Sequence, residues 1–167
     1  MRNSQPITHG SLLTAQGSHL MTHHSQHLIV ETDGAARGNP GLAGVGVIIK
    51  DESGHKIETI GKFLGVTTNN QAEYRALIEG LQAVQRHQPE SVTVRMDSEL
   101  VVKQMTGQYR VRHPEILPLY MQAVEAVQAL SEVRFELVPR ERNPGADRVA
   151  NMAIDSRMIQ GRGQHDD

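Results

Sequence analysis

The chain has 167 residues, of which 38% are hydrophobic and 22% are charged, a composition typical of one globular domain with a sizeable core. It contains no cysteine, which excludes disulfides and thiolate metal sites, and no apolar run approaches the ~20 residues that span a membrane. The formal net charge of -2 argues against a broad basic surface, so any nucleic-acid contact must rely on locally clustered basic residues or on metal ions.

The first 26 residues differ from the rest of the chain. They are rich in Ser, Thr, Gln and His, show no sustained periodicity and lack the basic and apolar pattern of a secretory signal. We therefore expect a disordered leader over residues 1–26 and a cytoplasmic location. His23, His24 and His27 are spaced closely enough to bind a metal, but a disordered segment is the simpler interpretation.

Segments of alternating apolar and polar residues, bounded by turn residues, predict three strands at the start of the folded part. A loop is expected after the first strand, at Asp33-Gly34 and at Gly38 to Gly41. The second strand contains two glycines and joins the third through a hairpin turn. These strands are expected over residues 27–32, 43–50 and 55–64.

Helices and strands alternate through the remaining sequence. Thr68, Asn69 and Asn70 offer caps for a helix with apolar residues at helical spacing. Ser98 is expected to cap a short helix, and Asn143 to cap the last one, with Pro144 at its first position. The expected elements are a helix over about 68–88, a strand over 91–96, helices over 98–105 and 114–130, a strand over 133–138, a helix from 144 and a flexible polar tail over 159–167.

This order of elements predicts an α/β fold. Three opening strands followed by alternating helices and strands imply a mixed sheet covered by helices. We expect residues 27–158 to form this single domain, with no internal repeat.

Four acidic residues occupy positions from which their side chains can converge. Asp33 and Asp97 are predicted at the ends of two strands, where open α/β sheets bind their ligands. Glu73 and Asp147 lie near the starts of two helices, on faces shared with apolar residues, so both are expected to point toward the sheet. Each acid also has an ordinary explanation as a turn residue or a solvated helix residue favoured by the helix dipole. Spacing alone therefore indicates only a possible metal site, one whose oxygens suit Mg²⁺ or Mn²⁺.

Sequence motifs around these acids resemble the signatures of type 1 ribonucleases H. They occur in the family's order and together span residues 28 to about 157. The four motifs are Thr32 to Gly41 (TDGAARGNPG), Thr67 to Tyr74 (TTNNQAEY), Met96 to Ser98 (MDS) and Arg142 to Asp147 (RNPGAD).

The resemblance implies a ribonuclease H-like fold with a five-stranded mixed sheet, in which three antiparallel strands precede the parallel ones. It implies an endoribonuclease that hydrolyses the RNA strand of RNA/DNA hybrids and leaves 5′-phosphate and 3′-hydroxyl ends. Asp33, Glu73, Asp97 and Asp147 match the catalytic acids, which hold two Mg²⁺ ions when substrate is bound, with Mn²⁺ as a possible replacement. We expect a monomer that binds hybrid and no membrane. A non-catalytic hybrid-binding domain and another nuclease of the same superfold are the alternatives.

The resemblance also implies substrate contacts at five positions. They are Gly34, Asn39, Thr68, Asn69 and Asn70. A glycine allows close approach of the backbone, and amide side chains can contact the 2′-hydroxyl without base preference. Asn69 and Asn70 are equally well explained as plain helix caps.

The loop before the last acid departs from many bacterial members, because it contains no histidine. It is similar to the archaeal-type branch, in which an arginine takes that place, and Arg140 is the first catalytic candidate and Arg142 the second. Arginine stays protonated and cannot act as a general base, so its expected role is to stabilise phosphate charge or to assist product release. A surface salt bridge with Glu141 or another acid is the alternative.

Two further departures concern the middle of the chain. The basic handle of some members is absent, because residues 107–114 lead directly into the next helix. Tyr109, flanked by Arg110 and Arg112, is a candidate to bind the DNA strand by stacking and charge, or else a residue at the edge of the core. Glu99 stands where many members have glutamine, which places an additional charge near the site.

Overall fold

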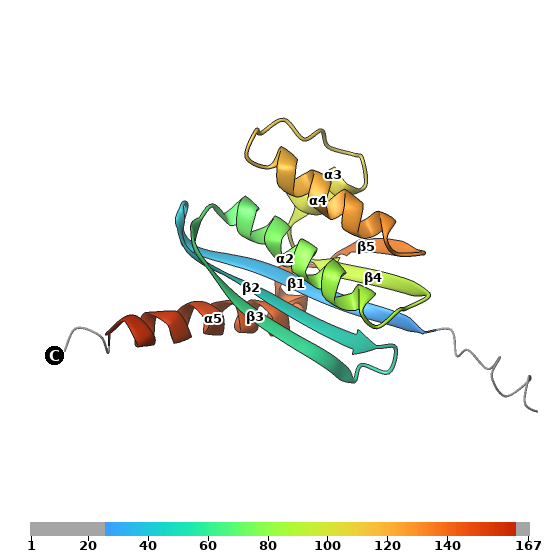
Figure 1. Cartoon of the computed structure of the whole chain (residues 1–167), viewed down its shortest axis with the longest axis horizontal. Helices are drawn as coiled ribbons and strands as arrows, with labels where there is room; N and C mark the ends of the chain where they lie inside the picture. The colour runs from blue at the N-terminus through green and yellow to red at the C-terminus, as the bar shows by residue number, and fades with distance from the viewer. Residues whose placement is uncertain (1–25, 163–167) are drawn as a thin grey trace, which may run out of the picture.

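The computed structural model describes residues 26–162; residues 1–25 and 163–167, with most of the predicted leader and tail and with His23 and His24, lie outside the described part. Five strands form one sheet in the order β3-β2-β1-β4-β5 (Figure 1). They are β1 (His27–Gly38), β2 (Gly41–Asp51), β3 (Lys56–Thr67), β4 (Ser91–Met96) and β5 (Val133–Leu137). Pairing is antiparallel from β3 to β1 and parallel from β1 to β5, which confirms the predicted mixed sheet.

β1 is longer than the sequence pattern predicts. The residues from Asp33 to Gly38 continue to pair with β2, so the loop predicted at Asp33 and Gly34 is wrong. Parallel pairing with β4 ends earlier, at Glu31 opposite Arg95. A long-range partner strand therefore outweighs the local turn preference of an Asp-Gly pair.

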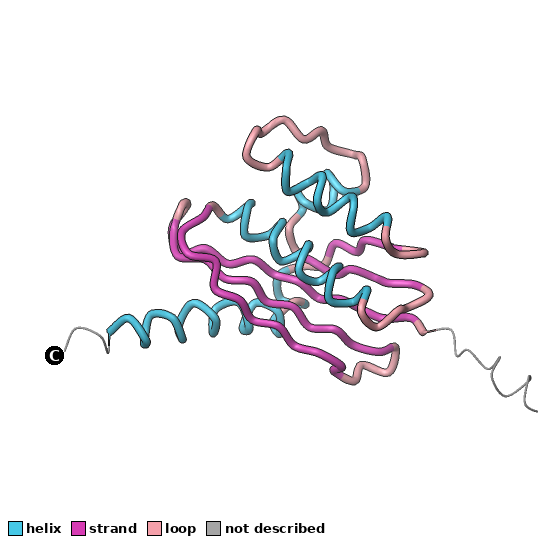
Figure 2. The backbone as a smooth tube through the Cα atoms, viewed as in Figure 1, coloured by secondary structure: helices cyan, strands magenta, loops and turns pink. Residues whose placement is uncertain are grey.

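Helices cover both faces of this sheet (Figures 1 and 2). α2 packs on β1 and β2 with α4 beside it, and α5 packs on β1, β2 and β3 from the opposite face. The helices are α2 (Asn69–Gln85), α3 (Glu99–Met105), α4 (Leu117–Gln128), α5 (Pro144–Arg162) and the 3-10 helix η1 (Arg140–Arg142). This order matches the predicted one. Within residues 26–162, no helix combines the length and the apolar character needed to span a membrane.

The two glycines inside β2 explain how α5 packs so closely. A Cβ atom at Gly44 would lie 2.6 Å from the carbonyl oxygen of Ala150, and one at Gly46 would overlap the carbonyl oxygen of Ala146. Side chains alternate along a strand, so the neighbouring Val45 points to the α2 face, where it is fully buried. The glycines therefore bring the helix that carries Asp147 directly onto the sheet.

The start of α2 is a capping box formed by Thr68 and Gln71. The Thr68 hydroxyl accepts a hydrogen bond from the Gln71 amide at 3.2 Å, and the Gln71 side chain accepts one from the Thr68 amide at 3.0 Å. Asn69 and Asn70 are the first two helical residues, with exposed side chains. Their interpretation as plain helix caps is therefore wrong.

The start of α5 also differs from the prediction. Asn143 does not cap the helix with its side chain, because its Nδ2 donates to the carbonyl of Thr32 at 3.0 Å and its buried Oδ1 has no hydrogen-bond partner. This bond attaches the beginning of α5 to β1 immediately before Asp33. At its other end α5 continues to Arg162, into the segment predicted as a tail.

Candidate active site

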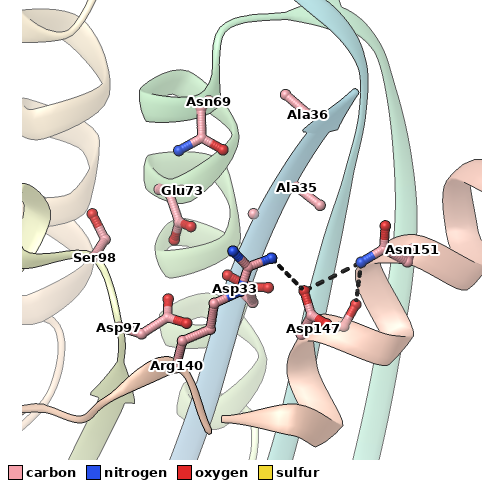
Figure 3. A pocket seen from close by; sticks show the side chains of 11 residues that line it. Asp33, Ala35, Ala36, Asn69, Glu73, Asp97, Ser98, Arg140, Asp147 and Asn151 are labelled. Atoms are coloured by element: carbon pink, nitrogen blue, oxygen red, sulfur yellow. Dashed lines mark hydrogen bonds and ion pairs between the residues drawn. The ribbon is translucent and has the colours of Figure 1, made fainter. Parts of the chain in front are cut away.

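Three acidic side chains converge where β4 ends. Asp33 comes from β1, Asp97 directly follows β4, and Glu73 lies in the second turn of α2. One carboxylate oxygen from each residue lies within 4.8 Å of the others (Figure 3). The two aspartates meet because β1 and β4 are neighbouring parallel strands.

Gly34 explains how Glu73 comes so close to Asp33. A Cβ atom at this position would overlap the backbone carbonyl of Ala72 and the amide nitrogen of Glu73. Only a glycine therefore lets α2 pack with its backbone against β1 at this point. The backbone amide of Gly34 also hydrogen-bonds to the Glu73 carboxylate and favours its charged form. The sequence predicts that the substrate backbone approaches Gly34 closely. In the structure, the backbone that lies closest to Gly34 is that of α2.

Asp147 stands beside this group rather than within it. Its side chain is 34% exposed and projects from the first turn of α5. Its Oδ1 accepts a hydrogen bond from Asn151 Nδ2 at 3.2 Å and lies 4.0 Å from the Arg140 guanidinium (Figure 3). The structure therefore places three acids in mutual proximity and the fourth at the side of the same pocket, in contact with Asp33.

The four acids line a single pocket of roughly 390 Å³. Backbone and side chains from five segments form its walls. Its lining residues are Asp33, Gly34, Ala35, Ala36, Asn69, Glu73, Asp97, Ser98, Arg140, Asp147 and Asn151. The pocket therefore combines carboxylates, one guanidinium and two side-chain amides, a set of groups suited to cations and phosphates.

Burial makes the charged forms of these acids costly. The pKa of Asp33 is raised to about 7, mainly by burial and also by the carboxylates of Asp97 and Asp147, while a hydrogen bond with Glu73 lowers it. Burial and the neighbouring Asp33 raise the pKa of Glu73 well above its usual range. Burial also raises the pKa of Asp97, although the Arg140 charge opposes this. The site is therefore short of positive charge.

The residues fit a divalent cation. Glu73 Oε2 is buried without a hydrogen-bond partner, although a buried carboxylate oxygen normally has one. The clustered ligand atoms all belong to carboxylates, which suit hard cations rather than zinc. A cation among Asp33, Glu73 and Asp97 would supply both the missing partner and the missing charge.

The same burial predicts how the stability of the metal-free protein depends on pH. The pKa of Asp33 is about 7 in the folded protein and 3.8 for an ordinary aspartate, so the unfolded chain loses this proton first as the pH rises. The folded state therefore loses stability between about pH 4 and about pH 7. Because a cation replaces the proton, Mg²⁺ is expected to raise the melting temperature more at about pH 8 than at about pH 5. Thermal unfolding with Mg²⁺ or a chelator measures this, and an equal effect at both pH values would contradict it.

Two of the predicted substrate-contact residues, Gly34 and Asn69, line the pocket. Asn39 Oδ1 accepts a hydrogen bond from the Asn69 amide at 3.1 Å, which attaches the β1–β2 turn to the start of α2. Thr68 is occupied by the capping box, whereas the side chains of Asn69 and Asn70 are exposed. Asn69 lines the acidic pocket. These two amides are therefore the best placed of the set to contact a ligand.

Tyr109 lies on the surface, so its interpretation as an edge of the core is wrong. Its residue is 42% exposed, and the Lys103 ammonium lies 5.0 Å from its ring centre. Lys103 also pairs with Glu99 at 2.6 Å, which compensates the additional charge at that position. Between α3 and α4 the described chain runs as a loop without a further helix (Figure 2), in agreement with the predicted absence of a handle.

The two arginine candidates of η1 occupy different surroundings. Arg140 lines the pocket and faces Asp147, whereas Arg142 is exposed outside the pocket lining. The salt bridge considered as an alternative role does form, but with an acid of the site rather than with Glu141. Arg140 can therefore pair with Asp147 in a salt bridge and also be the arginine that acts beside the acids of the pocket.

Four pocket residues were not predicted as site residues from the sequence: Ala35, Ala36, Ser98 and Asn151. Ser98 is the N-cap of α3, with its hydroxyl 3.4 Å from the Val101 amide. Asn151 lies one helical turn after Asp147, and this spacing of four residues was the available signal. His27, the described member of the histidine group, is hydrogen-bonded through its ring nitrogens to the hydroxyls of Ser91 and Thr93.

Comparisons with known proteins agree with this arrangement. Residues 31–153 match the protein family described as Reverse transcriptase-like. The chain is 42% identical over 130 residues to the bifunctional protein Rv2228c of Mycobacterium tuberculosis, covering 77% of this chain and 36% of that protein. It is 39% identical over 123 residues to ribonuclease HI of Halobacterium salinarum, covering 74% of this chain and 62% of that protein.

Solved structures show the same fold. The structure of LC11-RNase H1 in complex with an RNA/DNA hybrid is similar with a TM-score of 0.76 and 41% identity, covering 78% of this chain and 99% of that one. The acidic cluster and the four motifs lie within residues 31–153. The chain thus belongs to the Reverse transcriptase-like family and, within it, to the type 1 ribonucleases H.

Proposed function

We propose that this chain is an endoribonuclease that hydrolyses the RNA strand of RNA/DNA hybrids. The observation that carries the proposal is the convergence of Asp33, Glu73 and Asp97 within 4.8 Å, with Asp147 beside them, in a ribonuclease H fold. The relatives support this assignment, since they include ribonucleases H and a structure that holds a hybrid. The products are expected to carry 5′-phosphate and 3′-hydroxyl ends.

The four acids are proposed to hold two Mg²⁺ ions when substrate is bound, with Mn²⁺ as a replacement. Such ions activate a water and stabilise the leaving oxygen during phosphodiester hydrolysis. Asp33 and Asp97 come from adjacent strands and Glu73 from a rigid helix, so their carboxylates are held in place before substrate arrives. This preorganisation is the chain's own contribution to the reaction.

The substrate is proposed to lie across the pocket between the start of α2 and the loop after α3. The exposed amides of Asn69 and Asn70 lie on one side, where they can contact 2′-hydroxyl groups. Tyr109 and Lys103 offer a ring and a positive charge to the DNA strand on the other side. Gly34 and Asn39 are retained as backbone-contact candidates next to the pocket. A cytoplasmic, monomeric protein remains our expectation.

A substrate panel tests this proposal. We expect cleavage of labelled RNA/DNA hybrid in Mg²⁺ or Mn²⁺, no cleavage in chelator, and little cleavage of single-stranded or double-stranded RNA. Asp97→Asn is expected to abolish cleavage, because it removes one carboxylate from the cluster. Failure to cut the hybrid with either metal would refute the enzyme assignment and leave a hybrid-binding domain. Preferential cleavage of a different nucleic acid would instead indicate another nuclease of this superfold.

Arg140 is proposed to stabilise the phosphate charge or to help product leave, and its neighbour offers a matched control. Arg140→Ala is expected to lower kcat roughly tenfold or more, because a positive charge that lines the pocket is lost. Arg142→Ala removes the same charge two residues away and outside the pocket lining, and is expected to leave kcat nearly unchanged. Steady-state kinetics on the hybrid measure both, and equal losses in the two variants would contradict a specific role for Arg140.

A further inference from the structure

Asn151 of α5 donates a hydrogen bond to the Asp147 carboxylate. Its Nδ2 donates to Asp147 Oδ1 at 3.2 Å and to the Asp147 carbonyl oxygen at 3.0 Å. Both residues line the acidic pocket, and Figure 3 shows the Asn151 amide directed at Asp147. An asparagine that only bonded to the helix backbone four residues earlier would be an ordinary local interaction. Here the same amide group also reaches the carboxylate.

Arg37 determines which way this amide is turned. Its Nη2 donates to Asn151 Oδ1 and to the Asn151 carbonyl oxygen, each at 3.3 Å. Its Nη1 bonds to Asp155 Oδ1 at 2.5 Å, so the guanidinium is held between two residues of α5. A flipped amide would point its NH₂ group at the guanidinium and its oxygen at a carboxylate, two unfavourable pairs. Asn151 is therefore fixed with its donor toward Asp147.

The chain of contacts connects two elements that carry site acids. Arg37 lies on β1, four residues after Asp33, whereas Asn151 and Asp147 lie on α5. Asp147 stands outside the group of three clustered acids and is partly exposed, so packing alone does not fix its rotamer. Two donors, Asn151 and Arg140, face the same oxygen, Oδ1. Asp147 also contacts Asp33, so with Oδ1 engaged by these donors, Oδ2 is the oxygen that a cation beside Asp33 would take.

We infer that Asn151 is a positioning residue, which holds Asp147 Oδ1 so that Oδ2 faces the metal. Arg37 holds the Asn151 amide in the orientation that places its NH₂ group toward Asp147. The inference rests on the proposed function for its kinetic consequences, but not for its effect on metal binding. Side chains that orient a metal ligand from behind commonly change metal affinity by about 10- to 100-fold when they are removed. An effect of that size is expected from Asn151.

The experiment compares three variants of α5 in the full-length protein. Asn151→Ala removes the donor, and Asn151→Gln keeps an amide that can still reach an aspartate four residues earlier on a helix. Met152→Ala is the control, because this neighbouring side chain is 58% exposed and does not line the acidic pocket. Calorimetric Mn²⁺ binding to the substrate-free protein is measured together with the Mg²⁺ dependence of hybrid cleavage, kcat and KM.

Asn151→Ala is expected to weaken Mn²⁺ binding and raise the Mg²⁺ concentration for half-maximal rate by about tenfold, with KM for the hybrid little changed. Asn151→Gln is expected to recover most of this loss, and Met152→Ala to resemble the wild type. Wild-type metal affinity in Asn151→Ala, an effect confined to KM, or an equal loss in Asn151→Gln would overturn the inference. If the wild type fails to cut hybrid, the proposed function fails, and the Mn²⁺ binding series still decides the role of Asn151.

Discussion

Asp33→Asn is expected to reduce hybrid cleavage by about a thousandfold or more at saturating Mg²⁺, equivalent to a loss of about 4 kcal/mol of transition-state stabilisation. Asp33 lies between the other acids, with a ligand oxygen within 4.8 Å of both Glu73 and Asp97. The substitution keeps the shape of the side chain but removes the charge that a cation requires. Single-turnover cleavage of labelled hybrid measures the loss.

The same substitution is expected to stabilise the metal-free protein. Burial raises the pKa of Asp33 to about 7, so at about pH 8 the folded protein holds an ionised carboxylate at a cost. Asparagine has no such cost, and its NH₂ group can donate to the Glu73 carboxylate. The melting temperature in chelator should therefore rise while activity is lost, and the Mg²⁺-dependent stabilisation should shrink.

A distant acid provides the control for this pair of effects. Glu52→Gln removes one negative charge in the exposed β2–β3 turn and is expected to change neither activity nor Mg²⁺-dependent stabilisation. Cleavage by Asp33→Asn within tenfold of the wild type would contradict the assignment of Asp33. A lower melting temperature of the metal-free variant would contradict the electrostatic explanation of its pKa.

Gly34→Ala is expected to destabilise the fold by about 3 kcal/mol or more. Its Cβ atom would overlap backbone atoms of Ala72 and Glu73, which cannot yield unless α2 moves away from β1. Movement of α2 would also separate Glu73 from Asp33, so metal binding should weaken in whatever folded protein remains. Urea unfolding and Mn²⁺ calorimetry measure the two effects.

Gly61→Ala is the matched control on the same sheet. The nearest atom to its added Cβ would be a Val149 methyl group at 3.2 Å, which a small side-chain adjustment can relieve. We expect a loss below about 1 kcal/mol and unchanged metal binding. Equal destabilisation by the two substitutions would show that the position of α2 over Gly34 is not what makes this glycine necessary.

Much of the fold follows from local sequence patterns. The spacing of apolar residues predicts α2, and Ser98 caps α3 as predicted. β4 has the predicted bounds of residues 91–96. Such elements depend on side chains within a few positions of one another, and their periodicity is visible in the sequence.

The prediction failed where distant partners determine the backbone. Asp33-Gly34 is typical of a turn, yet pairing with β2 keeps it in a strand. Asn143 is typical of a helix cap, yet its amide bonds to Thr32, 111 positions away. In both cases the sequence contains a local preference but not the competing long-range contact.

Local sequence patterns predict the order of the elements, and the motifs around them make Asp33, Glu73, Asp97 and Asp147 the candidate site acids. How these acids are arranged depends on the tertiary structure, which clusters three of them and places Asp147 beside them with Asn151 hydrogen-bonded to it. It also showed that Gly34 makes room for α2 and that Arg37 reaches Asn151 from 114 positions away. The physical reason is that residue types and spacing limit what a side chain can bind, whereas sheet register and helix packing determine which distant groups it meets.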